Sequence, residues 1–220
     1  MKNILIAIIA FLSTSDTLFA QNINWRAFKA EQKQIIHIAA GFDYGFIAGV
    51  GYGYKVNTRM PIFLNIEYSF PSGKTLIDDF KTRIGGQMEV VNIGRFSATI
   101  KAYCPFRRFE NTQARVVSFG SEFSAVAGYY RPRWFVSGEF GFDKAIVTHI
   151  KHSERAVENT PTLQKGWYVP TAGNYFYGLQ TGFAFAKNDF SLKAGRIVSQ
   201  GFKTTPLIPF FAQVGYSRRF

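Results

Sequence analysis

The segment Leu207–Phe220 has the sequence LIPFFAQVGYSRRF and decides the fold. One set of alternating positions holds Ile208, Phe210, Ala212, Val214 and Tyr216, and the other holds Pro209, Phe211, Gln213, Gly215 and Ser217. A β-strand turns successive side chains to opposite faces, so this period of two predicts a strand with an apolar face and a small or polar face. Such a strand is typical of a segment that crosses a membrane within a β-barrel.

The same alternation recurs along most of the chain, interrupted by turn signals. The predicted strands cover residues 34–44, 46–55, 62–70, 80–90, 96–104, 117–129, 134–143, 175–185, 190–194 and 208–220. Together they predict an all-β fold, an antiparallel up-and-down transmembrane β-barrel of about ten strands, with eight as the alternative count.

Short and long connections alternate along this threading. The short turns fall near Thr58, Gly94, Pro132 and Asn188, and the longer loops fall near Ser72, Arg108, Glu158 and Phe202. Aromatic residues collect at two levels: Tyr54, Phe96, Tyr129, Trp134, Phe185, Phe190, Tyr216 and Phe220 at the lower one, and Tyr68, Phe70, Phe80, Phe142, Tyr175, Tyr177 and Phe210 at the upper one. Short periplasmic turns, longer outer loops and two aromatic girdles are expected of membrane barrels. Alternation alone does not say which face is wet, so a soluble lipocalin-like barrel with an apolar interior is the alternative.

The chain ends on an aromatic residue, Phe220, with Tyr216 on the same face of the last predicted strand. This ending resembles the closing strand of the Gram-negative outer-membrane β-barrel superfamily, in which the terminal aromatic residue is the recognition signal for the barrel-insertion machinery. The resemblance extends along nearly the whole mature chain, although Arg218 stands where the family usually has an apolar residue. It implies Tyr216 and Phe220 as the insertion signal, and the insertion machinery and periplasmic chaperones as partners. It matches no characterised subfamily and implies no particular function.

The other end of the chain indicates export. Lys2 precedes an apolar run at 4–12, and Leu18-Phe19-Ala20 stands before Gln21, which predicts a secretory signal peptide at residues 1–20. Residues 21–33 form a polar arm, expected in the periplasm, that either plugs the barrel base or is mobile, and mobility is the default for a terminus. Residues 34–220 form the barrel. The predicted location is therefore the bacterial outer membrane, after signal-directed export.

The charge and cysteine content of the chain indicate which binding partners and cofactors to expect. The formal net charge is +12, but Lys and Arg are scattered over turns and strands and form no run or helix face. This pattern favours contact with outer-membrane lipid headgroups and lipopolysaccharide phosphates over nucleic acid. The single cysteine, Cys104, is expected to be a free small residue near a strand end, not a catalytic thiol. The sequence predicts no cofactor and no metal.

Charged residues also occupy the inward positions of the predicted strands. They are Glu67, Lys81, Arg83, Glu89, Lys101, Glu122, Glu139, Asp143 and Lys193. A ring of one sign would indicate a selectivity filter. Mixed signs in a narrow lumen favour paired charges instead, because a buried ion is costly unless it is paired and hydrogen bonded. The sequence therefore favours a largely closed, salt-bridged interior over an open channel.

Catalysis, if present, belongs to the outer rim. The residues that could carry it are Asp78, Asp79, Asp143, His149 and His152, with Ser153 and Glu154 beside them. Omptin proteases activate water with acids and a His at the outer mouth, as Asp78, Asp79 and His149 or His152 would here, but no omptin motif matches residue by residue. Lipid A deacylases use Ser, His and an acid, yet the consecutive His152-Ser153-Glu154 do not share one strand face. His149 and His152 lack the further ligands that a metal site needs.

Three functional hypotheses follow. The first is a non-catalytic envelope or surface-binding protein, which would bind through the basic loops around Arg107-Arg108 and the long loop around Trp167. The second is a narrow channel for small solutes. The third is a rim-located hydrolase.

Overall fold

The computed structural model describes residues 23–43, 45–56, 58–71, 79–160, 163, 165–171, 173–200 and 208–220. The predicted signal peptide at 1–20 and the rim residue Asp78 lie outside these ranges. No helix in the described part of the chain is long and apolar enough to cross a membrane.

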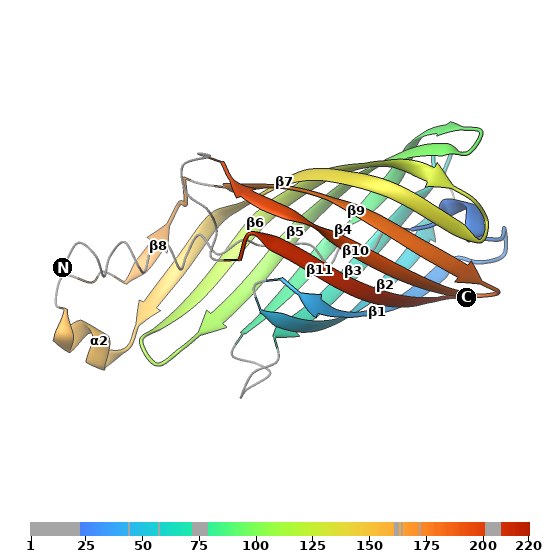
Figure 1. Cartoon of the computed structure of the whole chain (residues 1–220). Coiled ribbons are helices and arrows are strands. Elements are labelled where there is room, and N and C mark those ends of the chain that lie inside the picture. The colour runs from blue at the N-terminus through green and yellow to red at the C-terminus, as the bar shows by residue number, and fades with distance from the viewer. Residues whose placement is uncertain are drawn as a thin grey trace.

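Ten antiparallel strands close into a barrel (Figure 1), which confirms the predicted fold class and strand number. Each strand pairs with the next along the chain, β7 pairs with β9, and β1 pairs with β11 to close the cylinder. An eleventh strand, β8, is a short edge strand on β7. The elements are η1 (Trp25–Ala27), β1 (Gln34–Phe42), β2 (Phe46–Val56), β3 (Ile62–Pro71), β4 (Asp79–Ile93), β5 (Phe96–Glu110), β6 (Ala114–Tyr130), β7 (Trp134–His152), α2 (Glu154–Asn159), β8 (Gly166–Tyr168), β9 (Gly173–Phe185), β10 (Asn188–Ser199) and β11 (Phe210–Arg219).

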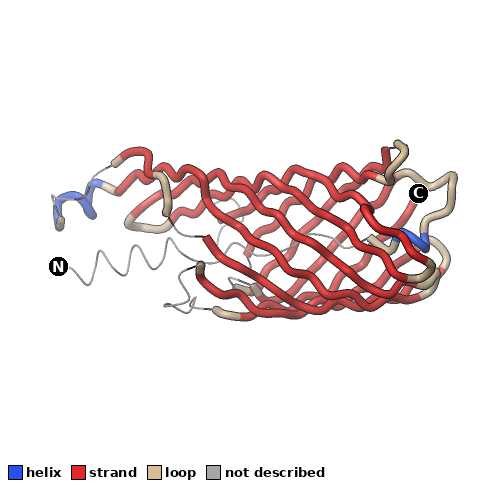
Figure 2. Tube along the Cα trace, turned by 90° about the horizontal axis from the view of Figure 1, so that it is seen from above, coloured by secondary structure: helices blue, strands red, loops and turns tan. Residues whose placement is uncertain are grey.

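The barrel wall is uneven in height. β1 and β3 have 9 and 10 residues, whereas β6 and β7 have 17 and 19. The strands run obliquely around the barrel (Figure 2), and the long strands β5, β6 and β7 reach the end from which α2 and β8 project (Figure 1). We call this end the loop end and the opposite end, which holds Phe220, the C-terminal end. At this end β5 stays paired with β4 as far as Asp79, and β6 stays paired with β7 as far as His152. We call the ends of β5, β6 and β7 here the extended sheet.

This extension corrects two sequence-based predictions. The basic loop expected around Arg107-Arg108 is mostly strand, because β5 continues through Pro105 to Glu110 and only residues 111–113 form the turn. Pro105 pairs with β4 but is absent from the β5–β6 ladder, and its ring lies close to Gly120, opposite which β7 has one extra residue, Ile146. The long loop expected around Glu158 and Trp167 follows a longer strand than predicted, because β7 continues past residue 143 to His152. Cys104 is consequently inside β5, free and exposed, and not near a strand end.

The two faces of the wall have opposite chemistry. On the outer face Leu179 and Phe185 are 69% and 68% exposed, while on the inner face Lys101 and Arg219 are 0% and 1% exposed. A water-soluble barrel would bury its apolar side chains and expose its charges. The lipocalin-like alternative, with an apolar interior, is therefore wrong for this chain.

Aromatic rings contact one another in two belts on the outer face. At the C-terminal end Tyr129 contacts both Phe96 and Trp134, with ring centroids 5.5 and 5.6 Å apart. Toward the loop end a continuous chain of rings runs across β3 to β6, through Tyr68, Phe80, Phe106 and Phe119, with centroids 4.8 to 5.8 Å apart. Belts at two levels are the positions at which aromatic side chains meet a membrane's two interfaces.

Glycines on the inner face make room for large neighbours. A Cβ on Gly182 would lie 2.3 Å from the Phe135 ring, and one on Gly141 would lie 2.1 Å from the Phe176 ring. Aromatic rings in the interior thus pack directly against the glycine backbone. Alanine at either glycine would force the facing ring to move.

Candidate functional site

The centre of the barrel interior is organised by Arg83 on β4. Its guanidinium donates to Glu67 on β3 at 2.5 Å and to both oxygens of Glu122 on β6 at 3.1 and 3.2 Å. The Arg83 guanidinium also lies over the Tyr103 ring, 5.4 Å from its centroid. The Lys81 ammonium is 3.9 Å from Glu122. One arginine therefore joins three strands through charge-assisted hydrogen bonds, which are stronger than neutral ones.

A second ionic cluster is centred on Glu139 of β7. Its two carboxylate oxygens lie 3.2 Å from the Lys101 ammonium and 2.5 Å from the Lys193 ammonium. The Ser124 hydroxyl donates to the same carboxylate at 2.9 Å. Two lysines sharing one carboxylate from opposite sides connect β5 with β10 across the interior.

All nine charged residues predicted to face the lumen lie on the inner face and are buried. Their exposed fractions run from 0% for Lys101 to 6% for Glu89. Glu89 accepts a hydrogen bond from Ser97, and Asp143 lies on β7 one inward position beyond Gly141. The described interior thus has cations and anions interleaved, with no ring of a single sign among these nine positions.

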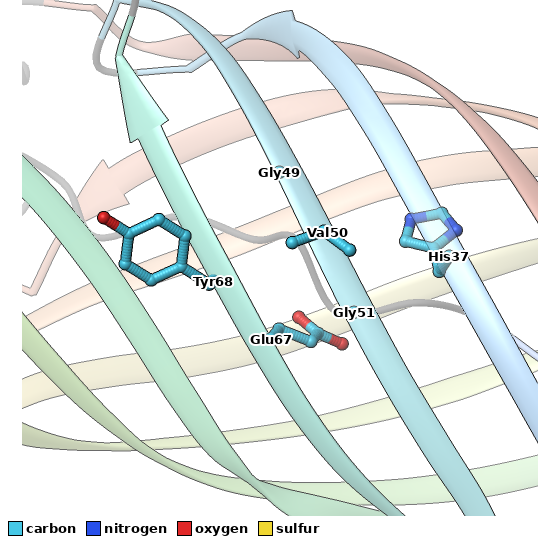
Figure 3. A pocket seen from close by; sticks show the side chains of 6 residues that line it. All are labelled: His37, Gly49, Val50, Gly51, Glu67 and Tyr68. Atoms are coloured by element: carbon cyan, nitrogen blue, oxygen red, sulfur yellow. The ribbon is translucent and has the colours of Figure 1, made fainter. Parts of the chain in front are cut away.

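A glycine separates two polar side chains in one cross-strand row. His37 on β1, Gly51 on β2 and Glu67 on β3 are register partners, so the imidazole and the carboxylate face each other over bare backbone. Together with Gly49, Val50 and Tyr68 they line a small pocket (Figure 3). A Cβ on Gly51 would lie 3.1 Å from Cγ of Glu67. The pocket is a gap between packed side chains, and it is too confined to hold a solute of substrate size.

His37 also forms a hydrogen bond across the closing seam. Its Nδ1 lies 2.9 Å from the Ser217 hydroxyl on β11. A serine beside a histidine is a component of hydrolytic sites. Both side chains are buried inside the filled barrel, however, so neither is open to a substrate in this structure.

The N-terminal arm enters the C-terminal end of the barrel. The Trp25 indole donates to the Thr99 hydroxyl on β5 at 3.0 Å, and the Asn24 amide donates to the Arg131 carbonyl in the β6–β7 turn at 3.0 Å. Ile23, Trp25 and Phe28 pack with Ile35 and Phe63 in one apolar cluster. Residues 23–28 of the arm therefore pack inside this end of the barrel, in the position expected of a plug.

The predicted rim residues are not assembled into one site. Asp79 begins β4, and its carboxylate lies 3.7 Å from the Arg107 guanidinium. Asp79 aligns through Phe109 and Val116 with Ile150, three strand spacings or about 14 Å around the wall. His149 faces outward and contacts the Trp167 ring at 4.8 Å, whereas His152, three residues on, is buried on the other face.

The remaining rim candidates have structural roles. The Ser153 hydroxyl caps α2 by accepting a hydrogen bond from the Ala156 amide, and Glu154 is the first residue of that helix. Among the described residues there is no group of three or more His, Cys, Asp or Glu that could hold a metal ion. The part of the rim that the structure describes therefore contains no arrangement of nucleophile, base and acid.

Sequence reasoning missed two inner contacts. The Arg219 guanidinium lies 2.9 Å from Asp189, which the sequence analysis had placed in a turn. Continuing the inward parity of Lys193 back along β10 would have found Asp189, because they are four residues apart. The pairing of Asp79 with Arg107 was missed because Arg107 was assigned to a loop.

Comparison with known proteins supports the fold and no more specific identity. No family model matches the chain and no curated protein matches it. Among solved structures, an outer membrane channel from Pseudomonas putida F1 aligns over 91% of this chain and 100% of its own, with a TM-score of 0.52 and 9% identity. The β domain of the Bordetella autotransporter BrkA aligns over 85% of this chain and 98% of its own, with a TM-score of 0.35 and 13% identity. A loop-deletion mutant of OmpT, an outer membrane protein of Vibrio cholerae, aligns over 96% of this chain and 72% of its own, with a TM-score of 0.36 and 10% identity.

These observations define the class of protein. A closed antiparallel barrel with an apolar outer face, aromatic belts and a charged, filled interior is a transmembrane-type β-barrel. The chain has the outer-membrane β-barrel fold, as the Pseudomonas channel shows, and no characterised subfamily is matched.

Proposed function

We propose that this protein is an integral outer-membrane barrel of a Gram-negative bacterium, with a non-catalytic structural or surface-binding role in the envelope. The observation that carries the proposal is the filled interior, in which buried ion pairs join β3, β4, β5, β6, β7 and β10. Opening a path for solutes would separate these charges, and breaking a buried pair is strongly unfavourable. Export through the signal peptide at 1–20 and recognition of Tyr216 and Phe220 by the insertion machinery belong to the same proposal.

The arm strengthens this proposal. A channel would need both ends open, and the apolar cluster of Trp25 and Phe63 occupies the C-terminal end. The arm is held at several points around that end, including the contact of Arg26 with the Gly94 carbonyl at 2.5 Å. An even number of strands places both barrel ends of the chain on one side of the membrane. Because short turns are expected on the periplasmic side, both ends belong to the periplasm in this proposal.

Planar bilayer recording tests the closed interior against the narrow-channel hypothesis. The wild-type barrel should give no conductance steps in potassium chloride from low to molar concentration. A variant with Glu139→Ala, Lys101→Ala and Lys193→Ala, which empties one ionic cluster, is the matched positive control for a widened lumen. Regular single-channel steps from the wild-type barrel would contradict the proposal and favour a channel.

A further inference from the structure

The outer face of the extended sheet carries a cluster of cations directly above the loop-end aromatic belt. Arg108 on β5, Arg115 on β6 and Lys151 on β7 all face outward, on the same face as Phe106 and Phe119. We call these three residues the basic band. Arg108 stands two residues beyond Phe106, so it lies about 7 Å farther along the strand toward the loop end.

The band is organised around one carboxylate. Glu110 accepts hydrogen bonds from Arg108 at 2.5 Å and from Arg115 at 2.9 Å through both Nε and Nη2. These side chains remain partly exposed, with Arg108 at 24% and Arg115 at 46%. Glu110 therefore holds the two guanidinium groups side by side while neutralising only one of them.

A like-charge contact remains within the band. Arg115 and Lys151 are direct register partners across β6 and β7. Like charges placed opposite each other on one sheet face are destabilising. Glu110 offsets only one of the band's three positive charges, so a further anion would be stabilised here. Arginine favours phosphate because its planar fork donates two parallel hydrogen bonds. The pairing thus points to an anionic ligand of phosphate type.

The belt beneath the band identifies the source of that phosphate. The ring chain through Phe80, Phe106 and Phe119 marks the level where acyl chains give way to headgroups. A cation one step above this level faces the headgroup layer. We propose that the basic band binds the phosphate of a phosphorylated, multiply acylated glycolipid of the outer leaflet, with the belt contacting its acyl chains. This site rests on the proposed function, because the outer face meets lipid only if the barrel spans the outer membrane.

Binding of purified lipid A to the full-length protein in detergent micelles tests the site, with native mass spectrometry as the readout. The variant Arg108→Gln, Arg115→Gln, Lys151→Gln should bind lipid A about tenfold more weakly than the wild type, as expected for the loss of several exposed charge contacts. The control variant Arg95→Gln, Arg131→Gln, Arg133→Gln removes the same charge at the C-terminal end and should bind as the wild type does. Dephosphorylated lipid A should bind the wild type as weakly as phosphorylated lipid A binds the band variant.

The outcomes separate the site from the proposed function. Each protein is first checked for heat-modifiable gel mobility, since a folded barrel migrates differently before and after boiling. If the band variant is folded and binds lipid A as tightly as the wild type, the site is wrong while the proposed function stands. If the wild type binds inorganic phosphate as tightly as it binds lipid A, the acyl chains contribute nothing, the band is a free-phosphate site and the lipid proposal is overturned. If the wild type shows no heat-modifiable mobility, the proposed function and the site both fail.

Discussion

The guanidinium of Arg83 donates to both carboxylate oxygens of Glu122, at 3.1 and 3.2 Å, across the interior from β4 to β6. The two residues are 39 positions apart in the chain and belong to strands separated by β5. Because the same guanidinium also binds Glu67, one buried side chain on β4 stabilises carboxylates from both β3 and β6. The barrel therefore has the opposite arrangement to a water-soluble protein, with ion pairs in its core and apolar side chains on its surface.

Replacing Arg83 should destabilise the barrel strongly. Arg83→Met leaves Glu67 and Glu122 without their shared cation, and removing one partner of a buried pair costs about 3–5 kcal/mol. Urea unfolding in lipid vesicles measures the free energy of unfolding. The control Arg108→Met, at a partly exposed outer position, should change it by about 1 kcal/mol or less. An Arg83→Met barrel as stable as the control would show that the interior pairs do not hold the strands together.

The arm should protect the C-terminal end of the interior. In a Cys104→Ser background, Thr99→Cys places a thiol under the Trp25 indole, and a water-soluble maleimide should modify it slowly. Adding Trp25→Ala removes the packed ring and should raise the rate by at least about tenfold, since deleting a buried large aromatic costs several kcal/mol of local stability. Trp134→Ala, on the outer face, is the control and should leave the rate unchanged. Equal rates with and without Trp25 would mean that the arm does not seal this end.

Cys104 should report the lipid-facing side of the wall. A spin label on this exposed thiol of β5 is expected to collide more often with oxygen, which partitions into lipid, than with a water-soluble nickel chelate. Gln113→Cys in a Cys104→Ser background, in the exposed turn after β5, should show the opposite preference. Electron paramagnetic resonance power saturation measures both. Nickel accessibility at Cys104 equal to that at position 113 would place this face in water.

Phe220 should matter for assembly more than for stability. Its backbone closes the seam, since the Phe220 amide donates to the Gln34 carbonyl at 2.8 Å, but its ring is 45% exposed. Phe220→Ala is expected to lower the amount of assembled barrel in cells several-fold, while the urea midpoint of the purified barrel stays near the wild-type value. Phe190→Ala, another ring of the same belt, should reduce assembly little. An equal loss in both variants would remove the special role of the terminal residue.

The sequence was sufficient to assign faces because parity does not depend on register. Ile36 and Ile38 face outward and His37 faces inward whichever strand lies beside them. The pairing of β1 with β11, which closes the barrel, could not be predicted from the sequence. The contact of His37 with Ser217 joins residues 180 positions apart, and it depends on how far β1 slides along β11 when the barrel closes. No local pattern encodes that offset.

Strand ends were the least predictable feature. Pro105 lacks an amide hydrogen and signals a loop, yet β5 passes through it because the adjacent β6 ladder is interrupted there and Gly120 leaves space for its ring. A strand end also separates the two rim histidines. With β7 extended to His152, the odd spacing of His149 and His152 puts the two imidazoles on opposite faces.

The central claim, a closed barrel that spans the outer membrane, is tested most directly by gel mobility of the protein from fractionated cells, with and without boiling in SDS. The account predicts that the protein is found in the outer-membrane fraction and that its mobility shifts on heating, because the paired strands from β1 to β11 resist SDS until they are heated. A protein recovered from the soluble periplasmic fraction, with the same mobility before and after boiling, would contradict it.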